Sequence, residues 1–317
     1  MNIPTLRLAK PREQSNRIPL AGRNYMIGGA VGLAVVFFTV WTIFPLIYTF
    51  VYSFTDWQPL RAEQQVIGLA NYQEALYQDR LFWISLRNTL AFVVGNVMGG
   101  GTLALLIALL INSAKRFTAF FRAAFFMPTI TGIVGVALVW SFIFQPRFGI
   151  LNNVIFSVAE TLHLPPPAEI GWLTRPQYAM ISIIIFGFWK FLGLRMIIFL
   201  AGLQSIPKMF YEAAEIDGAG TWGKFRFVTL PLLRPTMIFV LVTSVINSLQ
   251  VFEPMYVMPS DPGGPLNSTR TMVLHIFDKT FGLYRFGYGA ATSFILFAII
   301  MTITLLQLRV LNRRVDE

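Results

Sequence analysis

One stretch of the sequence has the glycine and lysine spacing of a phosphate-binding loop. Gly218, Gly220 and Gly223 fit the pattern G-x-G-x-x-G, and Lys224 follows directly. Such loops follow a strand, open a long helix and, in the magnesium-binding form, carry Ser or Thr after the lysine. Here the segment follows a helix-forming sequence, and Phe225 takes the place of the hydroxyl. We therefore expect this chain not to bind a nucleotide itself.

Residues suited to covalent or metal chemistry are scarce. Cys is absent, and the two histidines, His163 and His275, lie far apart in the sequence. Without thiolates or clustered histidines, the chain lacks the patterns typical of metal sites. It also lacks a convincing cluster of His, Asp and Glu. The sequence thus predicts a protein with no catalytic site, metal or cofactor of its own.

The remaining chemistry lies in polar residues within apolar stretches. Ionisable groups inside a membrane span are costly, and they mark function or an internal pairing. The stretch 178–203 holds Trp189, Lys190 and Arg195. In the stretch 236–258, Ser244, Asn247, Gln250 and Glu253 recur at helical spacing and form a polar stripe on one side of the expected helix. Hydrogen-bonding groups beside an aromatic ring suit a sugar. The candidate substrate-binding residues are Trp189, Lys190, Ser244, Asn247, Ser248, Gln250, Glu253 and Tyr256.

Two other interpretations of these residues stay open. Asn and Ser side chains also join membrane helices by hydrogen bonds, with no role in binding a ligand. Lys190 and Glu253 either pair with each other or, if they line a pathway, contact a charged sugar. In each case the polar stripe has to face protein or water, because lipid offers no hydrogen-bond partners.

The composition places these residues in an integral membrane protein. Hydrophobic residues make up 55% of the 317 positions, charged residues only 13%, and the mean hydropathy is +0.62. An average soluble domain carries about 25% charged residues. The hydrocarbon core of a bilayer requires roughly 20 apolar residues of helix. Six stretches meet this requirement, at about residues 25–54, 88–111, 123–144, 178–203, 236–258 and 288–308.

Basic residues indicate the orientation of these six spans. The segments that share a side with the N-terminus hold fifteen Lys and Arg, whereas those on the other side hold eight, balanced by eight acids. Positively charged loops stay on the cytoplasmic side. The sequence therefore predicts an all-α protein with six transmembrane helices and both termini in the cytoplasm. The net charge of +10 reflects this topology rather than nucleic-acid binding.

The cytoplasmic segment 204–235 has a pattern of its own. It predicts a helix over residues 209–216, a turn at Gly218 that tolerates a positive φ, and a second short helix from about Thr221. Pro231 and Pro235 are expected to mark the return of the chain to the membrane. The apolar residues of this helix–turn–helix suit a groove on a partner protein.

This loop resembles that of a known family. Its spacing matches the "EAA" loop of ABC importer permeases: Glu212-Ala213-Ala214, three residues, Gly218, nine residues, Val228, one residue, Leu230-Pro231. With Asp217 and Ala219 beside the glycine, the extended form is similar to the carbohydrate branch, which includes the maltose importer. Further pieces similar to that branch occur at residues 68–72, 87–89, 121–128, 200–207 and 263–271.

The resemblance implies a type I importer permease fold and a division of labour among subunits. In that family the EAA loop forms coupling helices that sit in a cleft of a cytoplasmic ATPase dimer, which binds ATP and Mg. A second, homologous permease subunit completes the pathway. An extracytoplasmic binding protein delivers the solute, here with residues 261–271 as a candidate docking surface. The expected coupling residues are Glu212, Ala213, Ala214, Asp217, Gly218 and Ala219.

The resemblance also implies a sugar or oligosaccharide as the solute, a location in the inner membrane, and a pocket on the helices that flank the EAA loop. Residues 69–79 have a helical pattern, and residues 261–265 are expected to be irregular. Two alternatives remain: a secondary, ion-coupled transporter, which would show inverted repeats, and an importer of a non-sugar solute such as glycerol phosphate. The predicted organisation is a cytoplasmic tail (1–24), a first helix with its outer loop (25–84), a permease core (85–308, with the coupling loop 204–235) and a second tail (309–317).

Overall fold

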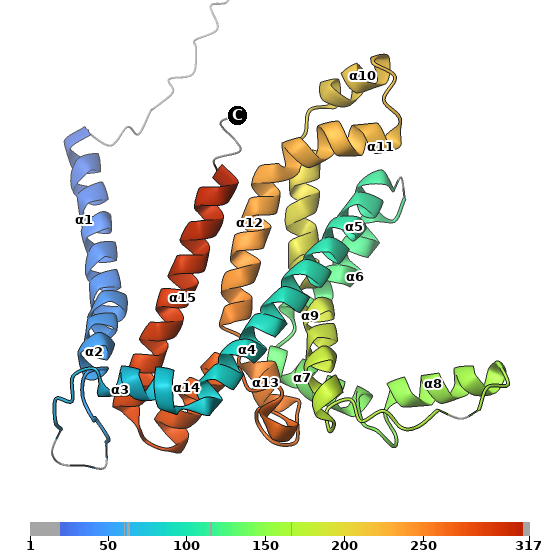
Figure 1. Cartoon of the computed structure of the whole chain (residues 1–317). Coiled ribbons are helices and arrows are strands. Elements are labelled where there is room, and N and C mark those ends of the chain that lie inside the picture. The colour runs from blue at the N-terminus through green and yellow to red at the C-terminus, as the bar shows by residue number, and fades with distance from the viewer. Residues whose placement is uncertain (1–19, 60, 62–63, 115, 166, 313–317) are drawn as a thin grey trace, which may run out of the picture. The chain divides into compact units, whose positions relative to one another are not determined.

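The computed structural model describes residues 20–59, 61, 64–114, 116–165 and 167–312. The chain divides into two compact units, Met1–Val51 and Tyr52–Glu317. In the described residues every regular element is helical, as predicted, and the only β pairing is an isolated bridge between Thr55 and Val66. Figure 1 shows the helices. Several of them contain π-helical turns, which are written η here.

The first unit is built on one long apolar helix. α1 (Leu20–Phe38), the π-helical turn η1 (Thr39–Ile43) and α2 (Phe44–Tyr52) follow one another without a break. Residues Ile27–Tyr52 are long and apolar enough to cross a membrane. The helix begins within the predicted tail 1–24, because no proline lies between Leu20 and the apolar run. The rest of that predicted tail lies outside the described residues.

The second unit contains four continuous helices of membrane-spanning length. They are α4–η3–α5 (Arg80–Val94, Gly95–Gly99 and Gly100–Ser113), α9 (Pro176–Gln204), α11–η4–α12 (Thr221–Lys224, Phe225–Thr229 and Leu230–Leu249) and α15 (Phe286–Asn312). Pro231 lies in the first turn of α12, where its missing N–H costs little, and the helix continues past Pro235. The two prolines therefore do not separate the loop from the span, contrary to the prediction. α15 runs into the predicted tail that begins at residue 309.

The predicted third span, residues 123–144, is a broken helix. α6 (Thr118–Ile130) and α7 (Ile133–Ile143) meet at an angle of 99°. Pro128 withholds a backbone N–H near the end of α6, and Thr131 and Gly132 leave the helical conformation. Within the described residues, five helices can span a membrane, or six if this bent pair counts as one span.

α9 lies at the centre of the packing and contacts α5, α6 and α12. Glycines allow two of these approaches. A Cβ at Gly99 would lie 2.3 Å from the ring of Phe188 in α9, and a Cβ at Gly193 would lie 2.2 Å from the carbonyl oxygen of Phe125 in α6. Small residues let membrane helices pack this closely. The position of α9 therefore decides which side chains face the interior of the unit.

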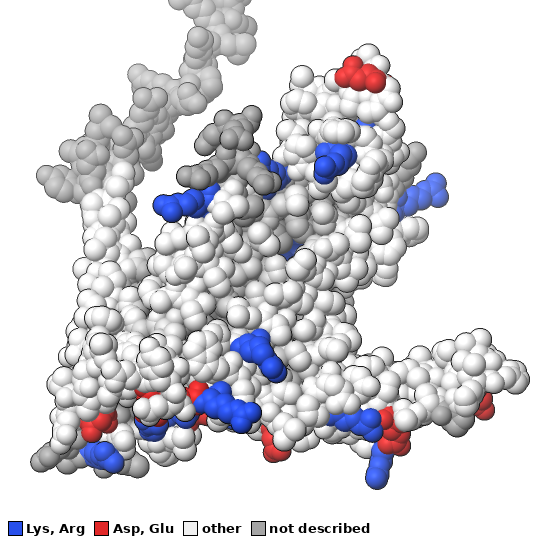
Figure 2. Space-filling model, viewed as in Figure 1, with Lys and Arg blue, Asp and Glu red and all other residues white. Residues whose placement is uncertain are grey.

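Short helices gather at the two ends of the second unit (Figure 1). α10 (Lys208–Ile216) and α11 lie at the end where α15 finishes. The helix predicted over residues 69–79 is confirmed, and residues 261–264 are irregular as expected, whereas Pro265 begins the short helix η5. Figure 2 shows charged side chains gathered at these two ends, with few between them. The other end holds α3 (Ala70–Gln73), η2 (Glu74–Gln78), α8 (Ile150–Thr161), α13 (Glu253–Val257), η5 (Pro265–Asn267), α14 (Met272–Phe277) and η6 (Asp278–Gly282).

Candidate functional site

A small cavity with both polar and apolar walls lies among α4, η3, α9 and α12. Its volume is about 60 Å³, and we call it the Arg195 cavity. Asn96 joins its walls: its Nδ2 donates to Ser248 Oγ at 2.9 Å, and its main-chain oxygen accepts a hydrogen bond from Arg195 Nη1 at 2.9 Å. π-helical turns such as η3 occur frequently at functional sites. The polar lining residues are Asn96, Arg195, Thr243, Ser244, Asn247 and Ser248.

Arg195 is the charged residue of this cavity. Its side chain lies within the spanning helix α9, and the residue is only 6% exposed. The guanidinium also packs on Gly100, where a Cβ would lie 2.4 Å from Nη1. The sequence marks Arg195 as an ionisable residue within a span but does not place it among the candidate ligands. The structure brings it beside three of them, Ser244, Asn247 and Ser248.

Lys190 contacts the end of α6 and does not line the Arg195 cavity. Its Nζ donates to the carbonyl oxygens of Pro128 at 2.6 Å and Thr131 at 2.5 Å, and it lies 3.4 Å from that of Thr129. These carbonyls end α6, where the helix itself supplies no partners and a cation is favourable. Lys190 therefore holds the break in the third span, and no ion pair joins it to Glu253 in the described residues.

The predicted polar stripe does not continue beyond Ser248. α12 ends at Leu249, Gln250 leaves the helix, and Glu253 opens a new helix, α13. The expectation that Gln250 and Glu253 share one helical face with Asn247 is therefore wrong. Tyr256 stacks on Phe252 with ring centroids 5.4 Å apart and is 41% exposed. None of these three candidates lines the Arg195 cavity.

Trp189 also lies apart from the Arg195 cavity. It packs against Trp140 of α7, with ring centroids 5.5 Å apart, and lines an open hollow beside Pro128. Trp189 and Arg195 are six residues apart, which separates them by roughly 120° around α9. The structure thus gathers three of the eight candidates at one cavity and adds three polar residues the sequence did not select, Asn96, Arg195 and Thr243.

A second candidate region is the α10–α11 loop, residues 208–224. α10 ends at Ile216, and Gly218 takes a left-handed φ of +77°. Gly218 N–H then donates to Glu215 O at 3.0 Å, and Ala219 N–H donates to Ala214 O at 2.8 Å. This pair of bonds is a Schellman C-cap, which glycine favours because it has no Cβ. The predicted helix, turn and second helix from Thr221 are confirmed.

The α10–α11 loop is fixed internally but open on its outer surface. An ion pair joins Lys224 to Glu215, and Tyr211 hydrogen-bonds Thr229 at 3.1 Å, which ties α10 to η4. Ile216 is 87% exposed and Trp222 is 73% exposed. A fixed element that presents large apolar side chains to water suits a protein partner. Glu212, Ala213, Asp217 and Gly218 are exposed in the same loop, whereas Ala214 and Ala219 are half-buried.

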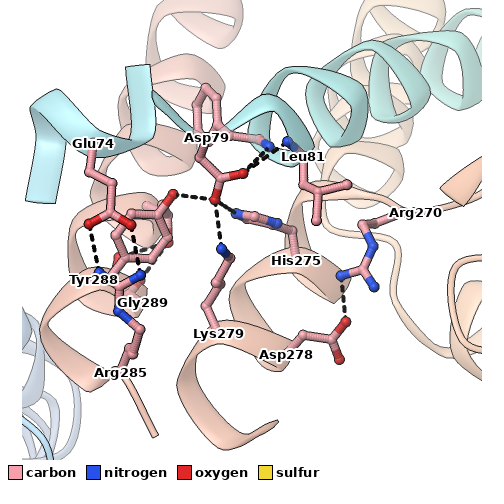
Figure 3. Close-up of polar contacts among 12 residues, drawn as sticks. Glu74, Asp79, Leu81, Arg270, His275, Asp278, Lys279, Arg285, Tyr288 and Gly289 are labelled. Atoms are coloured by element: carbon pink, nitrogen blue, oxygen red, sulfur yellow. Dashed lines mark hydrogen bonds and ion pairs between the residues drawn. The ribbon is translucent and has the colours of Figure 1, made fainter. Parts of the chain in front are cut away.

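The opposite end of the unit carries an ionic cluster that the sequence analysis missed (Figure 3). Asp79 caps α4, with Oδ1 accepting from Leu81 N at 2.9 Å, while Oδ2 accepts from Lys279 Nζ and from Tyr288 Oη, each at 2.8 Å. Burial acts to raise the pKa of Asp79, but these side-chain hydrogen bonds and nearby His275 lower it to about 2. An Asp directly before an apolar run is a helix-start signal and identifies this cap.

The cluster extends to both sides of Asp79. Arg285 donates two hydrogen bonds to the Glu74 carboxylate, of 2.7 and 2.6 Å. This hydrogen bonding lowers the pKa of Glu74. His275 is fully buried, its Nε2 lies 3.5 Å from Asp79 Oδ2, and burial lowers its pKa to about 4. η2, α4, α14, η6 and α15 are thereby joined at one place. We call Glu74, Asp79, His275, Lys279, Arg285 and Tyr288 the Asp79 cluster.

These features define a class of protein. Several apolar helices, a cavity between them and an exposed helical loop at one end are features expected of a membrane permease. The family described as "binding-protein-dependent transport system inner membrane component" matches residues 100–317. The chain belongs to this family, so it is an inner-membrane permease component of such a transport system.

Individual relatives agree with this assignment. The lactose transport system permease of Rhizobium radiobacter is 33% identical over 90% of this chain and 94% of its own length. The arabinooligosaccharides transport system permease of Bacillus subtilis is 31% identical over 87% of this chain and 85% of its own length. A chain of a bacterial ABC transporter involved in the import of the acidic polysaccharide alginate has a TM-score of 0.78 at 23% identity, covering 92% of this chain and 96% of its own. The fold is that of a type I ABC importer permease, as the resemblance implied.

Proposed function

We propose that this chain is one permease subunit of an ATP-driven importer of a sugar or oligosaccharide. Membership of the permease family supports transport, and the lactose and arabinooligosaccharide permeases among its relatives support a sugar. The amide and hydroxyl groups of the Arg195 cavity match the hydrogen-bonding needs of sugar hydroxyls. Ser244, Asn247 and Ser248 are the predicted ligands that line it.

The exposed α10–α11 loop supports the proposal that a separate ATPase drives transport. Ile216 and Trp222 are left in water by this chain, and burying such a side chain stabilises by about 1.5–3 kcal/mol. We assign the loop, including Glu212, Asp217 and Gly218, to the cleft of a cytoplasmic ATPase dimer. ATP and Mg bind to that ATPase, whereas this chain binds no cofactor and carries no catalytic site.

Two further partners complete the proposed importer. A second, homologous permease subunit supplies the other half of the pathway. An extracytoplasmic binding protein delivers the solute at the end opposite the α10–α11 loop, on residues 261–271. That loop is held against α4 because Asn88 Nδ2 donates to Asn267 O at 2.8 Å and Arg270 O at 3.1 Å, while Leu266 stays 86% exposed. A fixed loop with an exposed apolar tip suits docking.

The orientation of the chain is part of the proposal. The charge tally places residues 204–235 and the C-terminus in the cytoplasm, together with the N-terminus. The α10–α11 loop and the end of α15 lie at the same end of the second unit, which supports the first two of these placements (Figure 1).

Purification with and without a co-expressed ATPase tests this function. We expect a stable complex that hydrolyses ATP faster when the binding protein carries its sugar, and no hydrolysis by this chain alone. Solute accumulation by the chain alone, driven by an ion gradient, would instead identify a secondary transporter. Stimulation by glycerol phosphate but by no sugar would identify the importer of a non-sugar solute.

A further inference from the structure

Arg195 is a buried cation with no acidic partner in the described residues. It is 6% exposed, and the ion pairs in that part of the chain all involve other residues. Its one close hydrogen bond goes to the neutral carbonyl oxygen of Asn96. A charge inside a membrane protein is costly and pairs with an opposite charge or with backbone carbonyls, of which Arg195 has one. This charge therefore lacks its counterion.

The surroundings of the guanidinium are neutral. The residues that line the Arg195 cavity include neither Asp nor Glu, and their polar members are amides and hydroxyls. Lys190, the other ionisable residue of α9, is engaged with the carbonyls that end α6. Glu253 lies on α13 outside the lining. The cavity thus has a net positive charge and several groups able to donate hydrogen bonds.

The guanidinium is held in position rather than free to move. Nη1 lies against Gly100 and donates to Asn96, whereas Nε and Nη2 make no hydrogen bond with the described residues. A fixed planar guanidinium fits the paired oxygens of a carboxylate, sulfonate or phosphate. A water molecule occupies about 30 Å³ in the liquid, so a cavity of this size holds one small group rather than a sugar ring.

We propose that Arg195 binds an anionic group of the transported solute. This inference rests on the proposed function: the sugar it specifies is an acidic saccharide, carrying a carboxylate, sulfonate or phosphate. The acidic group enters the Arg195 cavity, and Asn247 and Ser244 hydrogen-bond the adjoining hydroxyls. The anion supplies the counterion that the chain itself does not.

Uptake by the complete importer separates this inference from the proposed function. Proteoliposomes with both permeases, the ATPase and the binding protein are given neutral oligosaccharides, the matching uronate oligosaccharides, a sulfonated sugar, a sugar phosphate and glycerol phosphate. We expect ATP-dependent uptake of one or more acidic forms and little of the neutral ones. Uptake restricted to neutral sugars would overturn the inference and leave the proposed function intact. Uptake of glycerol phosphate but of no saccharide would overturn the sugar importer while the anion site stands, and no uptake of any solute would overturn both.

Variants test Arg195 itself. Arg195→Gln should lower uptake of the acidic solute roughly 10- to 100-fold, because hydrogen bonds between charged groups are the strong ones. Gly100→Ala should act in the same direction by displacing the guanidinium, and Arg195→Lys should retain part of the activity. Arg309→Gln, at an exposed site on α15, is the matched control and should transport normally.

Two results would contradict this assignment of Arg195. Unchanged uptake of the acidic solute by Arg195→Gln would remove the residue from the binding site. Loss of co-purification with the second permease would show that Arg195 pairs with an acid of that subunit, and the inference would fall. Intact assembly combined with loss of acidic-solute uptake is the outcome expected.

Discussion

Gly218 takes a backbone conformation that other residues adopt only under strain. Its φ of +77° allows the two hydrogen bonds that close α10 and turn the chain toward α11. For a residue with a Cβ, this left-handed conformation costs roughly 1–2 kcal/mol in conformational energy, and for a β-branched residue it costs more. The turn therefore places a strict demand on one residue of the coupling loop.

Replacing this glycine should uncouple the subunit from its ATPase. Gly218→Val is expected to leave membrane insertion intact but to lower ATPase attachment or stimulation of hydrolysis by the loaded binding protein. Gly220→Ala is the control, because Gly220 has a φ of −70° and open space where a Cβ would lie. Normal import by Gly218→Val would remove the loop from coupling.

His275 should make stability depend on pH. Its folded-state pKa of about 4 lies below the ordinary 6.5 because burial outweighs the attraction of Asp79, and Lys279 and Arg270 also disfavour its charge. The folded state favours neutral His275. The resulting contribution to stability is therefore complete above pH 6.5 and is lost as pH falls toward 4. One pKa unit corresponds to about 1.4 kcal/mol, which gives a loss of about 2 kcal/mol from pH 7 to 5. Asp79, with a pKa of about 2, stays charged throughout.

Thermal unfolding in detergent between pH 7 and 5 measures this dependence. His275→Met should flatten it, and neither ring nitrogen of His275 makes a hydrogen bond whose loss would strand a partner. His163→Gln is the control, since His163 is exposed, and it should keep the wild-type slope. An unchanged slope in His275→Met would assign the pH dependence elsewhere.

At the scale of elements, the contact between α6 and α9 tolerates little change. A Cβ at Gly193 would lie 2.2 Å from the carbonyl oxygen of Phe125, and backbone cannot move aside as a flexible side chain can. Gly193→Ala should therefore destabilise the protein by about 1–3 kcal/mol or more, seen as a lower unfolding temperature and yield. Gly101→Ala, with nothing within 4 Å, should be neutral or stabilising. Equal behaviour of the two variants would contradict this packing.

The existence of the spans was predictable, but their interruptions were not. Hydropathy counts apolar residues and carries no information on the direction of the backbone. The break between α6 and α7 depends on Lys190, which satisfies the carbonyls at the end of α6 from a helix about sixty residues away. The end of α12 at Leu249 is equally hidden, because Gln250 and Glu253 keep the helical spacing of the polar residues before them.

The α10–α11 loop could likewise be predicted from the sequence, whereas the Arg195 cavity could not. The turn at Gly218 uses hydrogen bonds between residues at most five apart, so the local sequence contains it. The Arg195 cavity forms only when η3, α9 and α12 come together. Asn96 belongs to a predicted span that has no ionisable residue to mark it as a candidate. Trp189 was a reasonable candidate by residue type, but the rotation of α9 turns it toward Trp140.

At the scale of the whole molecule, the second unit separates its tasks along its length. The exposed α10–α11 loop lies at one end, the Asp79 cluster and the loop 261–271 lie at the other, and the Arg195 cavity lies within the spans (Figures 1 and 3). Charged residues gather at the two ends and apolar ones between them (Figure 2). This arrangement suits a subunit that forms a pathway while other chains supply the solute and the energy.

ATP-driven uptake in proteoliposomes is the measurement that bears most directly on this division of labour. We expect solute to accumulate only when this chain, the second permease, the ATPase, the binding protein and ATP are all present, and uptake to fall when Gly218 is replaced by Val. Accumulation that persists without the ATPase or without ATP would contradict the account.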